Sequence, residues 1–406
     1  MSDLENRRQF KTVHTDIEEM NAMIAEHRKK ILLRIVIIVA ICVAALVTFE
    51  LVVHLRTYHN YRVAKEVERE DSSGTVFEKM NGNILKYSHD GVSYTDLENN
   101  LIWNQTYELQ NPQADICESY VVIYDKSGSD IYILNTEGLQ GHLQSEQPIV
   151  AAYIAEQGTI AVLTTEDTTS QIQLYDKEGT QLAKGEVHIE EGGYPVDIAI
   201  SQDAQKVAVS MLDINEGSVK STIMFYNFSD VGENETDHIV GTFSYSGTMI
   251  PRIEFPTSDE MIAFGDNQII IFKGSQKPDE EMTIKVEEEV KSIFYNSTYF
   301  GIVQNYVPEE DEETDEDTPA YQMVIYGLNG KQITKSGFDY SYTDIEFLEN
   351  DEICMMGDKS CAIYTLKGKK KYEDTFDTEL YKIYSGKTTR SYIFLISGKT
   401  QKVYLR

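Results

Sequence analysis

The chain has 406 residues, with 36 Lys and Arg against 67 Asp and Glu, so its formal net charge is −31. The first 53 residues carry seven charges of each sign, so the whole acidic excess lies beyond them. A surface of this sign repels phosphate backbones, and we therefore expect no nucleic-acid partner. Four cysteines in a chain of this length are too few for a disulfide scaffold.

Residues 31–53 form the most apolar run of the sequence. A helix of that length, at about 1.5 Å per residue, reaches roughly the 30 Å of a bilayer core. The run predicts a transmembrane helix that acts as a signal anchor. Basic residues are denser at its N-terminal edge, which predicts a cytoplasmic N-terminus and an extracellular C-terminal domain on a single-pass cell-membrane protein. The flanking residues are Arg28, Lys29, Lys30 and Arg34.

The segments on either side of this run differ in character. Residues 1–30 form a predicted cytoplasmic tail, in which apolar residues recur at helical spacing over residues 10–24. That stripe could form a homodimer contact, lie on the membrane surface, or belong to a tail helix with no partner. Residues 54–70 contain no Gly or Pro, so residues 54–74 are expected to form a helical stalk and linker.

Residues 75–406 show short alternating strands separated by polar turns. A strand, a turn and a second strand recur, as in residues 172–184, 323–335 and 361–373. Eight such units, mostly 38 to 55 residues apart, predict an all-β fold, a β-propeller of eight blades, with seven blades as the alternative. The last unit lacks an outer strand, which Thr75–Met80 could supply.

An acidic insertion, residues 308–319, interrupts the sixth unit between its second and third strands. We expect a solvated hairpin tip there. Alternating carboxylates also allow a calcium loop, but Glu316 stands where a loop of the EF-hand type needs Gly.

The propeller region lacks recognisable catalytic motifs. It holds four scattered histidines and no zinc-ligand, nucleophile-elbow or phosphate-loop pattern. We therefore predict no catalytic residue, no metal site and no cofactor. Cys354 and Cys361 flank a predicted turn in diagonal positions, so a disulfide between them is possible but is not the default expectation.

Aromatic residues provide the candidate binding site. A few large side chains fall in predicted connections between blades, which converge on one end of a propeller. We select them as candidate ligand- or partner-binding residues, with ordinary loop packing as the alternative. They are Tyr194, Met249, Tyr340 and Tyr342.

Three stretches, residues 83–105, 194–210 and 225–235, carry a family resemblance. Through them the chain resembles a family of single-pass membrane-anchored β-propeller proteins of unknown function from Gram-positive bacteria. The second stretch also looks like WD40-type and quinoprotein-like propellers. The resemblance implies the fold and the anchoring, but it brings no catalytic residue and names no ligand. A single Trp excludes the Trp-docking repeats of quinone-cofactor propellers.

These observations favour a non-enzymatic scaffold that binds a protein or a component of the cell envelope. One alternative is a sensor of a glycan or small ligand in the central channel, and another is an extracellular hydrolase or lyase. An apolar patch on a loop face would favour the scaffold. Carboxylates and tyrosines with shifted pKa values at the channel mouth would favour the hydrolase.

Deleting residues 309–317 should leave the melting temperature unchanged, because a solvated loop tip contributes no core contacts. Thermal melts of the full chain and the deletion variant, each with and without calcium, test this. A calcium-dependent rise in the melting temperature of the full chain alone would instead establish a calcium loop.

Overall fold

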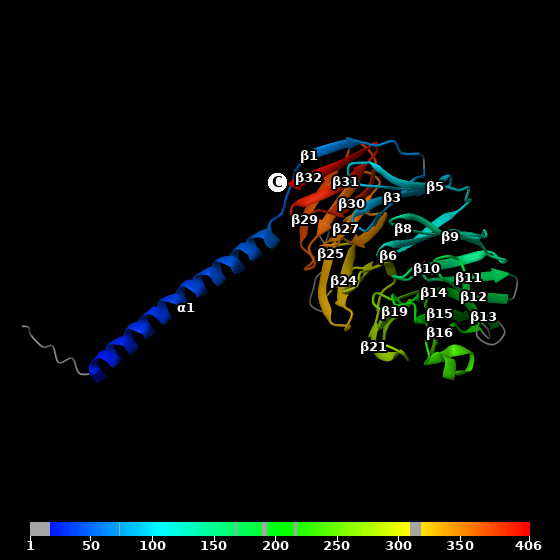
Figure 1. The fold of residues 1–406 in the computed structure, drawn as a ribbon, viewed down its shortest axis with the longest axis horizontal. Helices are drawn as coiled ribbons and strands as arrows, with labels where there is room; N and C mark the ends of the chain where they lie inside the picture. The colour runs from blue at the N-terminus through cyan, green and yellow to red at the C-terminus, as the bar shows by residue number, and fades with distance from the viewer. Residues whose placement is uncertain (1–16, 73, 167–168, 189–192, 215–216, 309–317) are drawn as a thin grey trace, which may run out of the picture. The chain divides into compact units, whose positions relative to one another are not determined.

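The computed structural model describes residues 17–72, 74–166, 169–188, 193–214, 217–308 and 318–406. The chain divides into two units, Met1–Arg56 and Thr57–Arg406. In the first unit, helix α1 covers Ile17–Leu55. In the second, the strands form eight antiparallel sheets of four strands each, which are the blades of a propeller (Figure 1).

Blades 1 to 4 each consist of four consecutive strands, from the inner to the outer. Blade 1 contains β2 (Val76–Met80), β3 (Asn83–Ser88), β4 (Gly91–Thr95) and β5 (Leu101–Thr106). Blade 2 contains β6 (Pro112–Cys117), β7 (Tyr120–Asp125), β8 (Asp130–Asn135) and β9 (Gly138–Gln144). Blade 3 contains β10 (Ile149–Ile154), β11 (Ile160–Glu166), β12 (Thr169–Tyr175) and β13 (Gln181–His188). Blade 4 contains β14 (Tyr194–Ile200), β15 (Lys206–Asp213), β16 (Lys220–Asn227) and β17 (Ile239–Ser246), with the short 3-10 helices η2 (Gly232–Asn234) and η3 (Thr236–His238) before β17.

Blades 5 to 7 repeat this order, and blade 8 departs from it. Blade 5 contains β18 (Arg252–Glu254), β19 (Glu260–Phe264), β20 (Gln268–Lys273) and β21 (Asp279–Lys285). Blade 6 contains β22 (Val290–Tyr295), β23 (Tyr299–Asn305), β24 (Tyr321–Gly327) and β25 (Gln332–Phe338). Blade 7 contains β26 (Asp344–Phe347), β27 (Ile353–Gly357), β28 (Ser360–Tyr364) and β29 (Lys370–Thr375). Blade 8 contains β30 (Leu380–Ser385), β31 (Ser391–Ile396), β32 (Lys399–Leu405) and, as its outer strand, β1 (Tyr61–Glu68).

The prediction of eight blades is confirmed, and the seven-bladed alternative is excluded. The repeats recognised in the sequence coincide with the third strand of each blade. The acidic insertion does fall between β23 and β24 of blade 6. Residues 309–317 lie outside the described residues, as does the calcium loop considered for them.

The ring is closed by a different strand from the predicted one. Thr75–Met80 was expected to complete the last blade, but β2 is the inner strand of blade 1. Strand β1 completes blade 8 by pairing antiparallel with β32, from Tyr61 opposite Leu405 to Glu68 opposite Lys399. In Figure 1 the blue β1 lies beside the red β32. The predicted helical stalk is therefore wrong over residues 61–68, because pairing with β32 outweighs local helix propensity.

The membrane prediction is also wrong. Within the described residues, no helix combines the length and the apolarity needed to cross a membrane. The charge-free run between Arg34 and Glu50 has only fifteen residues. Such a run reaches about 22 Å, short of the roughly 30 Å of a bilayer core. This finding contradicts the transmembrane helix over residues 31–53, the orientation inferred from its flanking basic residues, and the predicted cell-membrane localisation with an extracellular C-terminal domain.

The structure describes only part of the predicted N-terminal tail. Residues 10–16 lie outside the described residues, whereas helix α1 begins at Ile17. A homodimer contact through residues 10–24 therefore stays a prediction.

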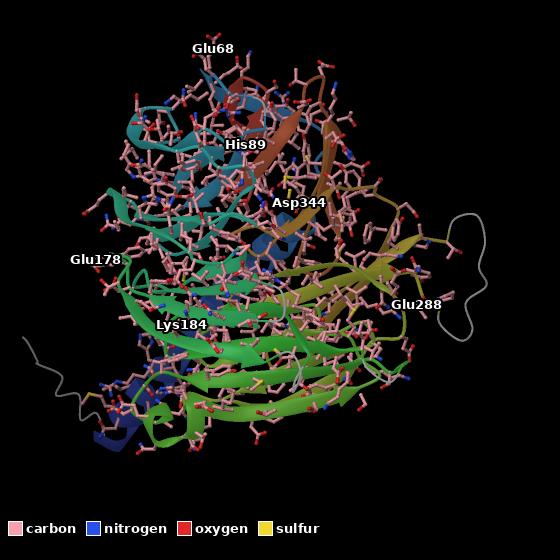
Figure 2. The ribbon with its side chains drawn as sticks, turned by 90° about the vertical axis from the view of Figure 1, so that its right-hand side faces the viewer. Glu68, His89, Glu178, Lys184, Glu288 and Asp344 are labelled. Atoms are coloured by element: carbon pink, nitrogen blue, oxygen red, sulfur yellow. The ribbon has the colours of Figure 1, made fainter. Side chains whose placement is uncertain are left out.

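The cores of the propeller lie between neighbouring blades. Side chains alternate along each strand, so one face of a blade packs on the blade before it and the other face on the blade after it. Between blades 4 and 5, Phe225 meets Phe272 with ring centroids 5.1 Å apart and Phe255 with centroids 6.4 Å apart. The acidic excess lies on exposed side chains such as Glu68, Glu178 and Glu288 (Figure 2).

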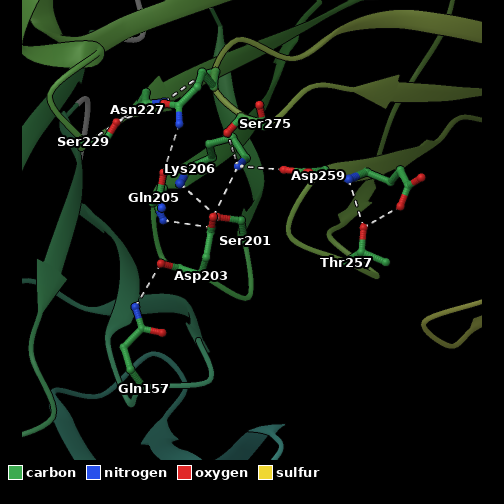
Figure 3. A network of polar contacts seen from close by, with 12 residues as sticks. Gln157, Ser201, Asp203, Gln205, Lys206, Asn227, Ser229, Thr257, Asp259 and Ser275 are labelled. Carbon is green, nitrogen blue, oxygen red and sulfur yellow. Dashed lines mark hydrogen bonds and ion pairs between the residues drawn. The ribbon is translucent and has the colours of Figure 1, made fainter.

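A fully buried lysine joins the same two blades. The ammonium of Lys206, at the start of β15, donates to the carbonyl of Ser275 in blade 5 at 2.8 Å. It also lies 3.7 Å from Oδ2 of Asp203 and 3.6 Å from Oδ1 of Asp259 (Figure 3). A buried ammonium is costly without partners, so this network holds the two blades in one relative position.

Arg69 also joins two blades, at the point where the ring closes. Its guanidinium forms two bonds to the carboxylate of Asp71, at 2.6 and 2.8 Å. It also donates to the carbonyl of Ile396 at 2.9 Å and lies over the ring of Phe77 in blade 1, 4.5 Å from the centroid. The bond to Ile396 of blade 8 and the stacking on Phe77 of blade 1 tie the two blades together, while Asp71 balances the charge of Arg69.

Cys354 and Cys361 are free thiols in the structure. They lie on one face of the β27–β28 hairpin, where Cys354 opposes Ile363 and Cys361 opposes Met356. Burial raises the pKa of both thiols well above its usual value. Both are packed in the core and chemically inert.

Two N-terminal truncations test the closure. A chain that starts at Thr57 should keep the melting temperature of the propeller, because it retains β1 and Arg69. A chain that starts at Asp71 should lose at least about 3 kcal/mol of stability, because it leaves β32 unpaired and removes Arg69. Denaturant titrations of both truncations measure this. Equal midpoints would show that β1 does not close the ring.

Candidate functional site

The two ends of the propeller differ in which connections they carry. At one end the inner strands begin, and we call this end the start face. The connections from each outer strand to the next inner strand lie there, together with the turns between second and third strands. At the opposite end, the end face, the inner strands finish. Loops on a rigid scaffold are the usual place for recognition sites.

An exposed apolar patch lies on the start face of blade 4. It comprises Tyr194 (53 % exposed), Ile214 (62 %), Val219 (39 %) and Met249 (40 %). Tyr194 begins β14, whereas Ile214 and Val219 lie in the turn from β15 to β16. Met249 belongs to the crossing to blade 5. We call these four residues the blade 4 patch.

Backbone contacts bring the four residues to one place. Tyr194 pairs with Leu212 at the end of β15, two residues before Ile214. The carbonyl of Val219 accepts from the N–H of Gly247 at 2.7 Å. The crossing then returns over the end of blade 4, where Ile250 donates its N–H to Ser221 Oγ at 3.0 Å and accepts from Ser210 Oγ at 2.6 Å. The crossing thus brings Met249 to the end of blade 4, where its backbone also pairs with Asp266 in the β19–β20 turn of blade 5.

The four predicted residues form two pairs that differ in exposure. Tyr194 and Met249 lie together and exposed in the blade 4 patch. Tyr340 and Tyr342 lie in the predicted crossing from blade 6 to blade 7, but both are half-buried against the core cluster between these blades. The hydroxyl of Tyr340 donates to Ser360 Oγ at 2.7 Å, and that of Tyr342 donates to Ser292 Oγ at 2.9 Å. Burial raises the pKa of Tyr340 to about 12.

Sequence reasoning missed Ile214 and Val219. Their signal was present, since two large apolar residues flank the polar turn of residues 215–218. In a short turn such residues have no core to enter. A search for apolar residues within predicted turns would have found both.

The channel contains a cluster of charged and tyrosine side chains. Arg252 forms an ion pair with Glu254 and lies 3.7 Å from Oδ1 of Asp197. It also donates to the hydroxyl of Tyr153, which in turn donates to Asp197 Oδ1 at 3.2 Å. The other oxygen of Asp197 accepts the backbone N–H of Ile253 at 2.9 Å. The cluster thereby joins the inner strands of blades 3, 4 and 5.

Burial shifts the pKa values of two carboxyl groups in this region. It raises the pKa of Glu254 to about 7, although the charge of Arg252 acts against the shift. It raises the pKa of Asp115, on β6, to about 6, although that carboxylate accepts the N–H of Ile154 at 2.8 Å. A cavity of about 180 Å³ lies beside both groups and opens where the inner strands end.

A second cluster lies on the inner strands of blades 7, 8 and 1. The ammonium of Lys382 lies 2.9 Å from Glu346, 3.6 Å from Glu78 and 3.7 Å from Asp344. Burial lowers the pKa of Lys382, but the three carboxylates outweigh it, so the pKa is raised. Burial raises the pKa of Glu346 to about 7, against the charge of Lys382.

These clusters are bonded to the walls of the channel. Carboxylates that attack or protonate a substrate must face an open site with their oxygens available. The carboxylates in this channel instead accept hydrogen bonds from backbone N–H groups or form ion pairs with Arg252 and Lys382. Within the described residues, no group of three or more His, Cys, Asp or Glu side chains could hold a metal ion.

The eight four-stranded blades and the closed ring define an eight-bladed β-propeller. The chain belongs to the family of unknown function DUF5711, whose model matches residues 54–405. That match includes β1, in agreement with its place in the ring. Among curated proteins, none matches the chain.

Solved propellers share the fold at low sequence identity. The C-terminal WD40 domain of Sif2 is 12 % identical with a TM-score of 0.54, covering 86 % of this chain and 99 % of its own. Sqt1 from Saccharomyces cerevisiae is 11 % identical with a TM-score of 0.53, covering 86 % and 99 %. BamB from Moraxella catarrhalis is 12 % identical with a TM-score of 0.48, covering 85 % and 100 %.

The raised pKa of Asp115 predicts a pH-dependent stability. The folded carboxyl keeps its proton up to about pH 6, whereas the unfolded one loses it near pH 4. The folded state therefore binds more protons between these values, and stability falls as the pH rises through this window. Asp115→Asn should remove this loss, so its advantage over the unmodified chain should grow by about 1 kcal/mol from pH 4 to pH 7.

Denaturant titrations at several pH values measure this difference. Asn retains an acceptor for the N–H of Ile154, so the fold should persist. Glu178→Gln, at an exposed position, is the control. Parallel pH profiles for Asp115→Asn and the unmodified chain would contradict the shifted pKa.

Proposed function

We propose that this propeller is a non-enzymatic protein-binding module that contacts its partner through the blade 4 patch. The observation that carries the proposal is the gathering of four large apolar side chains, 39 to 62 % exposed, on one end of a rigid blade. A cluster of exposed apolar residues on a loop face is the usual centre of a protein interface.

The surroundings of the patch indicate the chemistry of the partner. Asp213 ends β15 beside Ile214, and Asp266 accepts the N–H of Met249 at 3.0 Å. With the net charge of −31, these carboxylates favour a partner segment that is apolar at its centre and basic at its flanks. The charged rim would speed association, while the apolar centre would supply most of the affinity.

The raised pKa values of Asp115, Glu254 and Glu346 are the feature that would favour a hydrolase. The bonding of these carboxylates weighs against catalysis, because each is engaged with Arg252, Lys382 or a backbone N–H group. The WD40-like fold neighbours agree with an interaction module at the level of fold. The predicted binding role of Tyr340 and Tyr342 is the weaker proposal, because both side chains pack and bond within the propeller. A Gram-positive origin stays a prediction.

Site-specific photo-crosslinking in native cells tests the patch. A photoreactive residue at Ile214 should capture a discrete partner, whereas one at Leu101, which is equally exposed on outer strand β5, should not. The change Tyr194→Ser with Met249→Ser should abolish capture at Ile214 and leave the melting temperature within about a degree, because both side chains are exposed.

The matched control is Leu101→Ser with Leu139→Ser, two exposed apolar residues of outer strands. It should retain the crosslink at Ile214. Equal labelling from Ile214 and Leu101, or capture that survives the loss of Tyr194 and Met249, would refute a partner site on blade 4.

A further inference from the structure

A cavity of about 330 Å³ lies in the seam between blade 8 and blade 1. Strands β1, β31 and β32 form its wall on one side, and residues of blade 1 form the other. Val67 of β1, Leu97 of blade 1 and Ile393 of β31 give it apolar walls. A concave site of this size, mostly apolar with a few polar groups, is typical of small-ligand pockets.

Four lysines surround this pocket in a chain with a large acidic excess. Lys65 pairs with Glu98 at 2.8 Å, and Lys79 pairs with Glu349 at 2.5 Å. The ammonium groups of the other two, Lys387 and Lys402, have no ion pair or hydrogen bond in the part of the chain that the structure describes. The pocket thus carries an uncompensated charge of two ammonium groups on a protein with a net charge of −31.

The placement of Lys402 has a structural cost. It lies directly opposite Lys65 across the β1–β32 pair, next to a bulge between Val63 and Lys65. Like charges at directly opposed positions destabilise a strand pair. This pair of strands is the one that closes the ring. Nothing in the packing of blade 8 requires a cation at Lys402, whose side chain is exposed.

We propose that this pocket binds a small organic anion. Its phosphate or carboxylate group would lie between Lys387 and Lys402, and its apolar body would contact Val67, Leu97 and Ile393. The anion would neutralise Lys387 and Lys402, and its body would bridge the two blades at the seam. Binding would therefore stabilise the closure of the ring. The pocket lies on blades 8 and 1, so it is separate from the blade 4 patch and independent of the function proposed for that patch.

Titration calorimetry and thermal melts of the full chain test the proposal with defined probes. Phenyl phosphate and benzoate represent the two anionic groups, benzamide is the neutral analogue, and inorganic phosphate lacks the apolar body. We expect at least one organic anion to bind and to raise the melting temperature, with benzamide inert and inorganic phosphate at least about tenfold weaker than phenyl phosphate. Comparison of the two organic anions identifies the preferred head group.

Two charge-matched variants locate the site. Lys402→Gln should weaken the bound organic anion about tenfold, while the melting temperature without ligand stays equal or rises because the opposed charges are removed. Lys335→Gln, at an exposed position of blade 6, should change neither value. The unliganded melting temperature separates loss of the site from loss of the fold.

Three results would overturn the proposal. In the first, neither organic anion binds. In the second, inorganic phosphate or benzamide binds as tightly as phenyl phosphate, so charge and apolar body are not both recognised. In the third, Lys402→Gln binds the organic anion as tightly as the unmodified chain.

Discussion

The pairing of β1 with β32 is the constraint on which the rest of the propeller depends. Each blade is a small sheet that is stable only when both of its faces are covered by neighbours, so the ring needs its last blade to be complete and fixed against the first. Strand β1 completes blade 8, and Arg69 immediately after it bonds to Ile396 on one side and stacks on Phe77 on the other. The first strand and the last strand are thus held in one sheet, and the position of every blade between them follows.

Charged side chains fix the blades where apolar contact alone would allow them to slide. Lys206 is fully buried between blades 4 and 5, and Arg252 and Lys382 join inner strands around the channel. Each of these cations meets several acceptors from more than one blade. Such directional bonds fix the relative position of two β-sheets, whereas aliphatic packing holds the sheets together without fixing that position. By contrast, the exposed ammonium groups of Lys387 and Lys402 line a pocket and have no acceptor among the described residues.

Sequence reasoning located the connections that carry the candidate site, but not which of their side chains are exposed. The blade connections were located correctly, since turn residues and strand periodicity are local signals. Whether a tyrosine in such a connection points outward depends on its neighbours. Tyr194 and Met249 find no core to enter, whereas Tyr340 and Tyr342 find Ser360, Ser292 and the core between blades 6 and 7. Ile214 and Val219 join the patch only because the crossing to blade 5 returns over the same end of blade 4.

The sequence by itself determined the all-β class, the eight repeats, the third strand of each blade and the place of the acidic insertion, because strand periodicity and turn composition act over a few residues. It left open whether the thiols of Cys354 and Cys361 pair. Only the tertiary structure decided that residues 61–68 form a strand rather than a stalk, and which strand closes the ring. The physical reason is the same in each case of pairing: the partner, β32, lies more than 330 residues away along the chain, and no local pattern records a contact at that distance.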